Sequence, residues 1–291
     1  MSLERKVAVV TDSGSSMRPE YKEAQDLGVT IVPLEIKFYE NGQYVPYGDL
    51  ESTPEEFYQR MRKSEKIPQT SGAVIGRIFE TYKRLSKETD SAISVHITSK
   101  HSVAWESAVA GAKIAQEEIP GVLDIEVIDS RQLSLGTWLL VEHAALLSQK
   151  GARLEQIKEE VLAMIPQVQL LVVLKTFENL KKGGRANDVV QAYFASLLQI
   201  NPILGLQEGK LVRLEMTRSA KKSRGRMVEM VGDSGKLVRV GLLHTHALEV
   251  AEEVEKALSN IYQGEMPVYD AGPVLGVHAG EGAVGVVFQK A

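Results

Sequence analysis

Short apolar runs alternate with helical stretches through the first half of the chain, and this order limits the folds open to it. Residues 6–11 (KVAVVT), 91–97 (SAISVHI) and 125–128 (IEVI) are short, apolar and bounded by polar residues, as buried parallel strands are. Helical patterns lie between these runs. The repeated order of strand, loop and helix predicts a parallel sheet with helices on both faces. Ligands of such sheets bind outside the carboxyl ends of the strands.

Helix boundary signals occur at several places in this half. Thr53, Pro54 and Glu56 form a capping-box pattern, with Thr53 as the N-cap and Pro54 as the first helical residue. A further strand is expected within residues 29–38, with Pro33 at an edge or a bend. The same kinds of signal predict helices over residues 53–63, 74–87, 103–118, 135–150 (ended by Gly151) and 153–164.

The second half begins near residue 168 and has a different order of elements. Its expected elements are strands at 169–174 (QLLVVL), 237–244, 266–271 and 285–288, a hairpin at 200–215, and helices at 176–182, 187–198, 219–231 and 247–261. The hairpin adds an antiparallel component, so a mixed sheet is expected. A length of 291 residues suits two domains. We therefore predict an N-terminal α/β domain over residues 1–165 and a C-terminal mixed-sheet α/β domain over residues 166–291.

Composition excludes several classes of function. The formal net charge is -4, whereas general nucleic-acid binding needs a strong basic excess. The lack of cysteine rules out disulfides, thiolate metal sites and cysteine nucleophiles. The longest apolar runs, such as residues 170–174, are too short to span a bilayer, and the start of the chain has no signal-peptide pattern. We expect a cytoplasmic protein that neither binds nucleic acid nor inserts stably into a membrane.

Hydroxyl-bearing loops follow three of the expected strands. These loops carry Ser13, Ser99, Ser102 and Ser130. Because the carboxyl ends of parallel strands share one edge of a sheet, the serines predict a polar site there. Serine is also a common helix cap, and that interpretation stays open for each of them.

Two glycine-rich segments carry groups that suit an anion. His278 lies within residues 272–282, where glycine and proline in a loop allow the backbone to approach a ligand closely. Its imidazole can donate to an anion, although a tight turn with an incidental histidine is the alternative. Residues 180–185 (LKKGGR) place three cations beside two glycines, which favours an anion-binding nest.

Motifs for enzymatic chemistry do not occur in the sequence. The P-loop, dinucleotide-binding and GxSxG patterns are missing, and serines without an activating base are binding groups rather than nucleophiles. His244 and His246 lack a third ligand at the spacing of a metal site, and His143 is expected to pack in a core. The basic run at residues 221–226 is either a solvated helix face or a docking site for an acidic partner.

Seven segments in one order resemble the DegV family of bacterial fatty-acid-binding proteins, which includes carrier subunits of the bacterial fatty acid kinase system. The resemblance extends from Lys6 to Phe288. Its segments are Thr11-Asp12-Ser13, Pro68-Gln69-Thr70-Ser71, residues 99–108, Asp129-Ser130, residues 180–185, residues 200–204 with Gly209-Lys210, and residues 272–282. The chain departs from the family pattern at Gly72-Ala73, at residues 101–105, at Asn201 and at Glu281.

This resemblance implies a two-domain α/β fold that holds one long-chain fatty acid in the cleft between the domains. It implies that three side chains contact the carboxylate, namely Thr70, Ser102 and His278. Three further residues are implied as their neighbours, namely Ser71, Arg185 and Gly280. The family's role implies a carrier that performs no chemistry, needs no cofactor or metal, and presents its fatty acid to a partner, a fatty acid kinase. A small-molecule kinase or hydrolase acting in the same cleft is the alternative.

Overall fold

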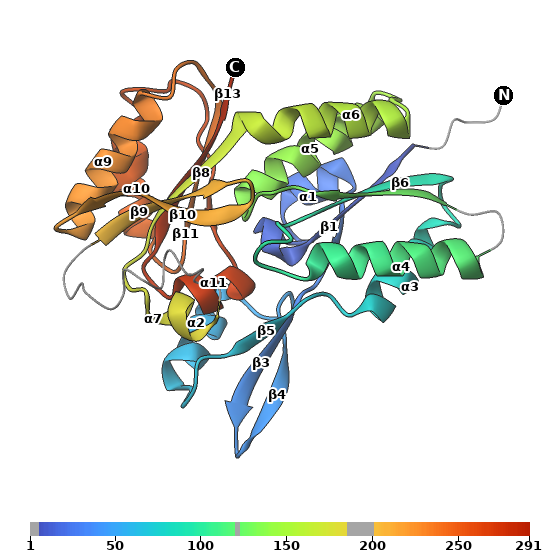
Figure 1. Ribbon diagram of the computed structural model, residues 1–291, viewed down its shortest axis with the longest axis horizontal. Coiled ribbons are helices and arrows are strands. Elements are labelled where there is room, and N and C mark those ends of the chain that lie inside the picture. The colour runs from blue at the N-terminus through green and yellow to red at the C-terminus, as the bar shows by residue number, and fades with distance from the viewer. Residues whose placement is uncertain (1–5, 120–122, 185–200) are drawn as a thin grey trace.

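The computed structural model describes residues 6–119, 123–184 and 201–291, which form three sheets (Figure 1). A four-stranded sheet with its helices makes up one half of the molecule, and a six-stranded sheet with its helices makes up the other. A three-stranded sheet projects from the junction of the two halves (Figure 1). The α/β class predicted from the sequence is confirmed, with a parallel N-terminal sheet and a mixed C-terminal sheet.

All neighbours in the four-stranded sheet run parallel, in the order β2-β1-β6-β7. The strands are β1 (Ala8–Asp12), β2 (Thr30–Val32), β6 (Ser91–His96) and β7 (Asp124–Asp129). Successive side chains of a strand point to opposite faces. Val9 and Val10 accordingly belong to two different apolar cores, one on each face. The continuous apolar run in β1 thus reflects burial on both faces.

Helices cover both faces of this sheet, as the sequence predicts. Two of them, α3 (Ile75–Leu85) and α4 (Ala104–Glu118), pack on one face. The helices on the other face are α5 (Leu135–Gln149) and α6 (Leu154–Met164), with α1 (Lys22–Leu27) against α5. The carboxyl ends of β1, β6 and β7 lead into the loops that carry Ser13, Ser99, Ser102 and Ser130.

The six-stranded sheet has the order β10-β9-β8-β13-β11-β12. Only β11 and β12 pair in parallel, and the other neighbours are antiparallel. Its strands are β8 (Val168–Val173), β9 (Asn201–Gln207), β10 (Lys210–Thr217), β11 (Leu237–His244), β12 (Val268–Asp270) and β13 (Val284–Lys290). Helices α9 (Ala220–Gly232) and α10 (Leu248–Leu258) cover one face.

Helix α5 lies between the two large sheets and contacts both of them. One apolar core contains Val9 and Ile93 of the first sheet, α5, and Leu170 and Val287 of the second sheet. A helix buried on two sides is apolar around most of its circumference, which accounts for the composition of residues 135–149. Because this core is continuous across both halves, a domain boundary between residues 165 and 166 stays a prediction.

The three-stranded sheet has the order β4-β3-β5 and is antiparallel. It consists of β3 (Glu35–Glu40), β4 (Gln43–Gly48) and β5 (Gln69–Ser71), and helix α2 (Pro54–Lys63) lies between β4 and β5 in the chain. Residues 29–38 contain strand, as predicted, but it is divided in two, because the chain passes from β2 in one sheet to β3 in another on either side of Pro33. Proline has no N–H for a strand ladder, which suits such a break.

Of two sequence-based predictions about helices, one is confirmed and one is wrong. The capping box of α2 is confirmed, since the Glu56 amide donates to Thr53 Oγ1 at 3.2 Å and the Thr53 amide donates to Glu56 Oε2 at 2.8 Å. The loop expected over residues 272–282 was wrong in its centre, which forms helix α11 (Pro273–Ala279). Proline at the first helical position has the backbone angle a helix needs, and this outweighs the glycines around it.

Two further expectations concern single segments. His143 was expected in a core, but its side chain is 30% exposed and its Nε2 lies 3.8 Å from Glu160 Oε2. Its position on α5 is near the Glu160 surface of α6, away from the sheet-facing sides of the helix.

The helix expected over residues 187–198 lies outside the described residues. Within the described ranges, no helix combines the length and apolar character needed to cross a bilayer.

Candidate ligand-binding site

A threonine and a histidine from opposite halves of the chain meet in one contact. Thr70 is the central residue of β5, and His278 lies in the last turn of α11. Thr70 Oγ1 is 2.7 Å from His278 Nε2, and both residues are half-buried. When Nε2 carries the imidazole proton, His278 donates to Thr70, and the threonine hydroxyl hydrogen is then directed at another acceptor. The pair is therefore equipped to hold an anionic oxygen.

Two glycines allow the close packing that places His278. Helix α11 lies against α2 and against α7 (Glu178–Lys182) (Figure 1). A Cβ atom at Gly276 would lie 2.5 Å from Tyr58 Oη, and one at Gly183 would lie 2.5 Å from His278 Nδ1. Real Cβ atoms do not approach other atoms this closely, so any larger residue would push α11 away from its neighbours.

A cavity of about 770 Å³ opens beside the Thr70–His278 pair. Small-molecule sites usually have volumes of roughly 300–1,000 Å³. Its walls come from the segment between α2 and β5 on one side and from α7 and α11 on the other. The carbon-rich side chains in these walls are Tyr44, Met61, Ile67 and Pro68. The cavity thus joins a polar pair to an apolar wall.

The cations around the cavity are engaged with other groups. Arg62 Nη1 lies 2.7 Å from Glu281 Oε1, and Lys182 forms an ion pair with Glu178. The ammonium group of Lys66 lies 3.4 Å from the ring centroid of Tyr39. The negative charge of Glu281, one of the departures from the DegV pattern, is therefore balanced by Arg62. An anion at the Thr70–His278 pair meets uncharged donors first.

Comparison with known proteins identifies the family. The family model described as "Uncharacterised protein, DegV family" matches residues 6–291. A DegV domain-containing protein of Halalkalibacterium halodurans is 32% identical over 287 residues, covering 97% of this chain and 97% of the relative. The chain belongs to the DegV family.

Solved DegV structures share the whole fold. A fatty-acid-binding DegV family protein from Thermus thermophilus has a TM-score of 0.86 at 27% identity and covers 98% of this chain and 100% of that one. DegV from Bacillus subtilis, described as a fatty acid binding protein, has a TM-score of 0.86 at 28% identity, covering 99% and 100%. A DegV family protein from Ruminococcus gnavus, refined with vaccenic acid, has a TM-score of 0.85 at 25% identity, covering 97% and 99%.

Of the three residues that the DegV resemblance assigned to the carboxylate, Thr70 and His278 are in direct contact. Ser102 lies in the turn before α4, where its Oγ accepts from the Ala104 amide at 3.1 Å. This turn is beside the end of β5, because a Cβ atom at Gly72 would lie 2.5 Å from Val103 Cγ2. Among the described contacts, Ser102 is not bonded to Thr70 or His278, so its role as a ligand contact stays a prediction.

The three further residues named by the DegV resemblance lie in different surroundings. Ser71 is exposed and donates to Glu35 Oε2 at 2.9 Å, since neighbouring residues of a strand point to opposite faces. Gly280 donates its amide to Gly276 O at 2.9 Å and accepts from Thr245 Oγ1 at 2.6 Å. Its backbone polar groups are thus used within the protein. Arg185 lies outside the described residues.

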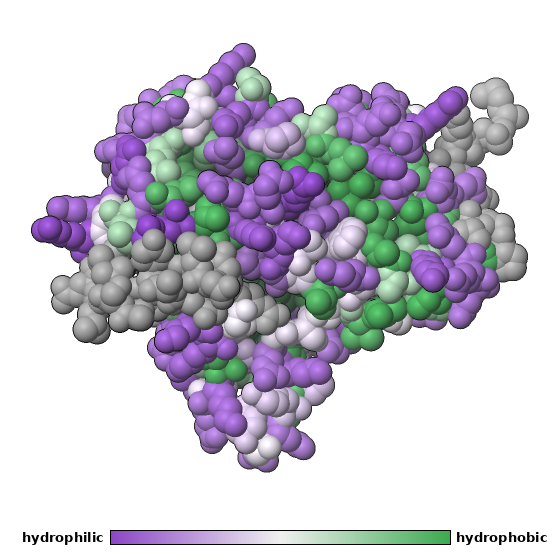
Figure 2. Space-filling model, in the orientation of Figure 1, coloured by the Kyte–Doolittle hydropathy of each residue, from purple (hydrophilic) through white to green (hydrophobic). Residues whose placement is uncertain are grey.

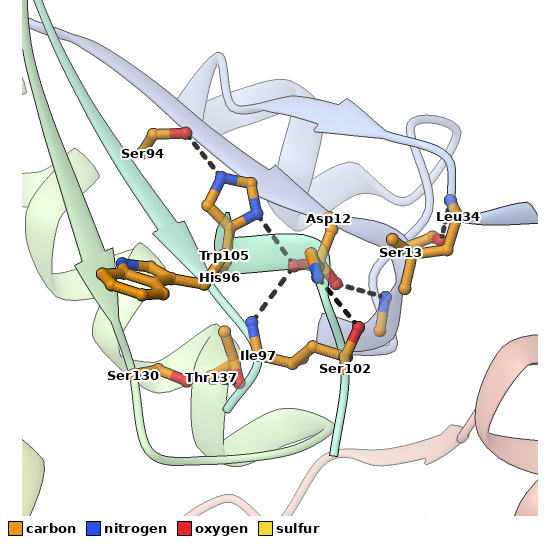
Figure 3. Close-up of polar contacts among 12 residues, drawn as sticks. Asp12, Ser13, Leu34, Ser94, His96, Ile97, Ser102, Trp105, Ser130 and Thr137 are labelled. Carbon is orange, nitrogen blue, oxygen red and sulfur yellow. Dashed lines mark hydrogen bonds and ion pairs between the residues drawn. The ribbon is translucent and has the colours of Figure 1, made fainter. Parts of the chain in front are cut away.

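Sequence reasoning missed a buried polar chain at the ends of β1 and β6 (Figure 3). Asp12 Oδ2 is 2.9 Å from His96 Nδ1, and His96 Nε2 is 2.7 Å from Ser94 Oγ. Tyr82 Oη donates to Ser94 Oγ at 2.9 Å. The hydrogen bonds can all point in one direction: the tyrosine donates to the serine, the serine to the histidine and the histidine to the carboxylate. Every group in this row then has a partner. Strand alternation could have placed Ser94 and His96 on one face, but their partners on β1 and α3 could not be read from spacing.

The order Asp, His and Ser in this chain resembles a catalytic triad, but its position excludes that role in the described conformation. Asp12, Ser94 and His96 all have 0% exposure. A serine nucleophile must reach a substrate carbonyl, and Ser94 Oγ faces Tyr82 and His96 instead. This hydrogen-bonded row of side chains is therefore a structural element of the protein in the conformation described.

The other loop serines are bonded within the protein. Ser13 Oγ accepts from the Leu34 amide at 3.0 Å, and Ser99 Oγ donates to Asp129 Oδ2 at 2.6 Å. Ser130 Oγ lies 3.1 Å from Thr137 Oγ1. Ser102 Oγ accepts from the first amide of α4, but the N-cap of that helix is Val103, which makes no side-chain cap bond, so Ser102 is not the cap. The polar edge of the sheet is thus largely an internal network.

His244 and His246 each lie beside a carboxylate, and the basic run on α9 forms ion pairs. His244 Nδ1 lies 3.4 Å from Asp270 Oδ2, and His246 Nε2 lies 3.1 Å from Glu55 Oε2. No group of metal-ligating side chains is found in the part of the chain that the structure describes. The basic run lies on α9, where Arg226 pairs with Glu215 at 2.8 Å while Lys221 and Lys222 are exposed. Docking of an acidic partner there stays a prediction.

Asp49 makes stability depend on pH. It is 2% exposed, and its burial raises the pKa of its carboxyl group to about 6, although a hydrogen bond from Ser13 opposes this shift. The unfolded chain therefore ionises first, and the folded state loses relative stability as pH rises from about 4 to about 6. We expect the free energy of unfolding of Asp49→Asn, relative to that of the natural chain, to rise by roughly 2 kcal/mol between pH 4 and pH 7, at about 1.4 kcal/mol per pKa unit. Urea unfolding at both pH values measures it, and an equal difference at both would contradict it.

Proposed function

We propose that this chain binds one long-chain fatty acid by its carboxylate, in the cavity between the α2–β5 segment and helices α7 and α11. The observation that carries the proposal is the 2.7 Å contact between Thr70 Oγ1 and His278 Nε2 at the cavity wall. The two residues come from the two halves of the molecule, so a ligand held there is held between them. The proposed carrier function also draws on the DegV relatives that bind fatty acids.

A carboxylate suits the polar end of this cavity. It accepts hydrogen bonds on both oxygens and has no donor of its own at neutral pH. Thr70 supplies an uncharged hydroxyl donor that His278 orients, and the nearby cations Arg62 and Lys182 are already paired with carboxylates. Binding by neutral donors avoids the desolvation cost of a fully buried ion pair. The pair then fixes the orientation of the ligand.

Apolar burial supplies most of the affinity for an acyl chain. Each methylene group removed from water contributes roughly 0.8 kcal/mol. Eight buried methylenes would thus contribute about 6 kcal/mol, more than the net value of a few hydrogen bonds at about 1 kcal/mol each. The apolar wall of Met61, Ile67 and Pro68 begins beside the polar pair, as such a ligand requires. The chain lengths preferred then depend on how far the apolar path continues.

We further propose that the chain is a carrier without catalysis or cofactor, which acts in the cytoplasm and presents the fatty acid to a partner enzyme, a fatty acid kinase. A half-buried histidine bonded to a threonine orients an acid but cannot phosphorylate it, and the sequence has no P-loop. A kinase or hydrolase acting in the same cleft remains the alternative function. Turnover of ATP or acyl esters by the purified chain alone would favour that alternative.

The decisive experiment is analysis of bound lipid. The purified chain is extracted with organic solvent, and the extract is examined by mass spectrometry for fatty acids. We expect about one fatty acid per chain, or uptake of added palmitate to that ratio after delipidation. A chain that arrives empty and does not take up palmitate would refute the proposed function.

A further inference from the structure

The carboxylate of Asp12 holds together two ends of the parallel sheet. Its Oδ1 accepts from the Gly14 amide at 2.9 Å, and its Oδ2 accepts from the Ile97 amide at 3.1 Å and faces His96 Nδ1 at 2.9 Å (Figure 3). The side chain is fully buried. Both oxygens are thus occupied by donors from the segments that follow β1 and β6. Buried charge-assisted bonds of this kind are short and strongly directional.

The first of these segments leads to Thr70. The turn held by Gly14 includes Ser13, whose Oγ accepts from the Leu34 amide at 3.0 Å (Figure 3). Leu34 immediately precedes β3, and β3 pairs with β5 in a register that sets Ile36 opposite Thr70. The hydrogen bond to Leu34 therefore fixes where the pairing of β3 with β5 begins. It thereby fixes the position of Thr70 along that sheet.

The second segment leads to the turn of Ser102. The Ile97 amide is held by Asp12, and the carbonyl of the next residue, Thr98, accepts from the Ser102 amide at 3.2 Å. Packing makes the two segments dependent on one another, because a Cβ atom at Gly14 would lie 2.7 Å from Ile97 Cδ1. A shift of either segment thus displaces the other.

The third connection leads to His278 in the other half of the molecule. Ser16, at the end of the turn after β1, donates to Ala271 O at 2.9 Å. Two residues beyond Ala271, the chain enters α11. The turn anchored by Asp12 is thereby bonded to the segment that leads into α11. This bond restricts where the helix, and His278 at its end, can lie.

We propose that Asp12 is a positioning residue of the ligand site, which sets the separation of Thr70, His278 and the Ser102 turn through these three connections. The proposal rests on the proposed fatty-acid function. The chain of His96, Ser94 and Tyr82 behind Asp12 orients the carboxylate, since each member accepts or donates in one direction. Asp12 itself lies below the cavity wall and does not line the cavity.

Two substitutions test the proposal in the full chain. Asp12→Asn keeps the shape but replaces one acceptor oxygen with an NH₂ group, which must then face either the Gly14 amide or the Ile97 amide and imidazole. Ser16→Ala removes the bond to Ala271 O together with the 2.7 Å contact with Ser134 Oγ, and it is the milder change because Asp12 keeps its bonds. The matched control is Ser148→Ala, which removes a buried serine bond to Val7 O at the opposite end of β1.

The probe is palmitic acid labelled with ¹³C at the carboxyl carbon. Its affinity and the NMR shift of its bound carboxyl carbon are measured. Both measurements use folded protein, well below its melting temperature. We expect roughly tenfold weaker binding or more for Asp12→Asn and roughly fivefold for Ser16→Ala, the size of a misaligned hydrogen bond in each case. The carboxyl resonance should move in both variants and stay in place in Ser148→Ala. A role limited to stability would lower the melting temperature and leave the resonance unchanged.

The outcomes separate the two proposals. Natural affinity and an unmoved carboxyl resonance in folded Asp12→Asn and Ser16→Ala would overturn the positioning role while leaving the carrier function intact. A natural chain that does not bind palmitate would refute the carrier function, and the positioning role with it. If Asp12→Asn does not fold, the comparison of Ser16→Ala with Ser148→Ala decides by the same two measurements.

Discussion

Replacing His278 with alanine is expected to weaken palmitate binding by roughly 10- to 150-fold, the equivalent of about 1.5–3 kcal/mol for a hydrogen bond to a charged group. The imidazole contacts Thr70 at 2.7 Å and lines the cavity, so its loss frees the threonine hydroxyl group from the orientation in which it donates to the ligand. Isothermal titration with delipidated protein measures the change. Because the apolar wall is untouched, some affinity should remain.

The direct contact makes a sharper test possible. Thr70→Val removes the hydroxyl group and keeps the shape, and the double variant should lose much less than the sum of the two single losses, because contacting residues act together. His143→Ala is the matched control, since it removes a histidine from the far side of α5. Strictly additive losses for Thr70→Val and His278→Ala would contradict a shared site for the carboxylate.

Replacing Phe57 with alanine is expected to lower the free energy of unfolding by about 3–5 kcal/mol. The ring is fully buried and packs beneath Gly276 of α11. Its centroid lies 6.0 Å from the ring centroid of Phe38 and 4.9 Å from that of Tyr58. The substitution leaves a cavity at the contact between α2 and α11, where neighbouring backbone limits collapse. Urea unfolding followed by circular dichroism measures the loss, and ligand affinity should fall with it because α11 carries His278.

Phe79→Ala gives the comparison for this core. Its ring is only partly buried at the edge of the same apolar cluster, so the same chemical change should cost clearly less than it does at Phe57. A loss at Phe57 below about 1 kcal/mol, or equal losses at both positions, would show that the contact between α2 and α11 does not depend on this ring.

Surface character agrees with a protein whose apolar groups are mainly internal. On the face drawn in Figure 2, most of the described surface is hydrophilic, and apolar side chains show mainly in the region that α4, β6 and α5 occupy in Figure 1. The most exposed apolar residues, Val103 and Leu248, lie on different elements, and Val74 and Ile75 form an adjacent pair at the start of α3. Isolated apolar residues of this kind are normal on soluble domains.

Much of the fold follows from local patterns. The buried strand β1, the capping box at Thr53 and the hairpin of β9 and β10 were all predicted, because each depends on residues close together in the chain. Thr70 and His278 were named through motifs of the DegV resemblance, and each motif is likewise a short segment. The assignment of these residues to a carboxylate remains a prediction that binding experiments must test.

The errors have one physical origin. Helix α11 forms where a glycine-rich loop was expected, because packing against α2 and α7 stabilises a short helix there. The partnership of Asp12 with His96 was missed, since 84 positions separate them in the chain. Residue spacing does not report which loops meet when a parallel sheet closes.

The sequence by itself determined the alternation of strands and helices, the helix caps and the family, because these are properties of contiguous residues. Only the tertiary structure decided that α5 lies between two sheets, that Thr70 meets His278 across 208 positions, and that Asp12 connects the segments around them. Such contacts depend on how whole elements pack, and packing is set by the shapes of side chains from every part of the chain at once.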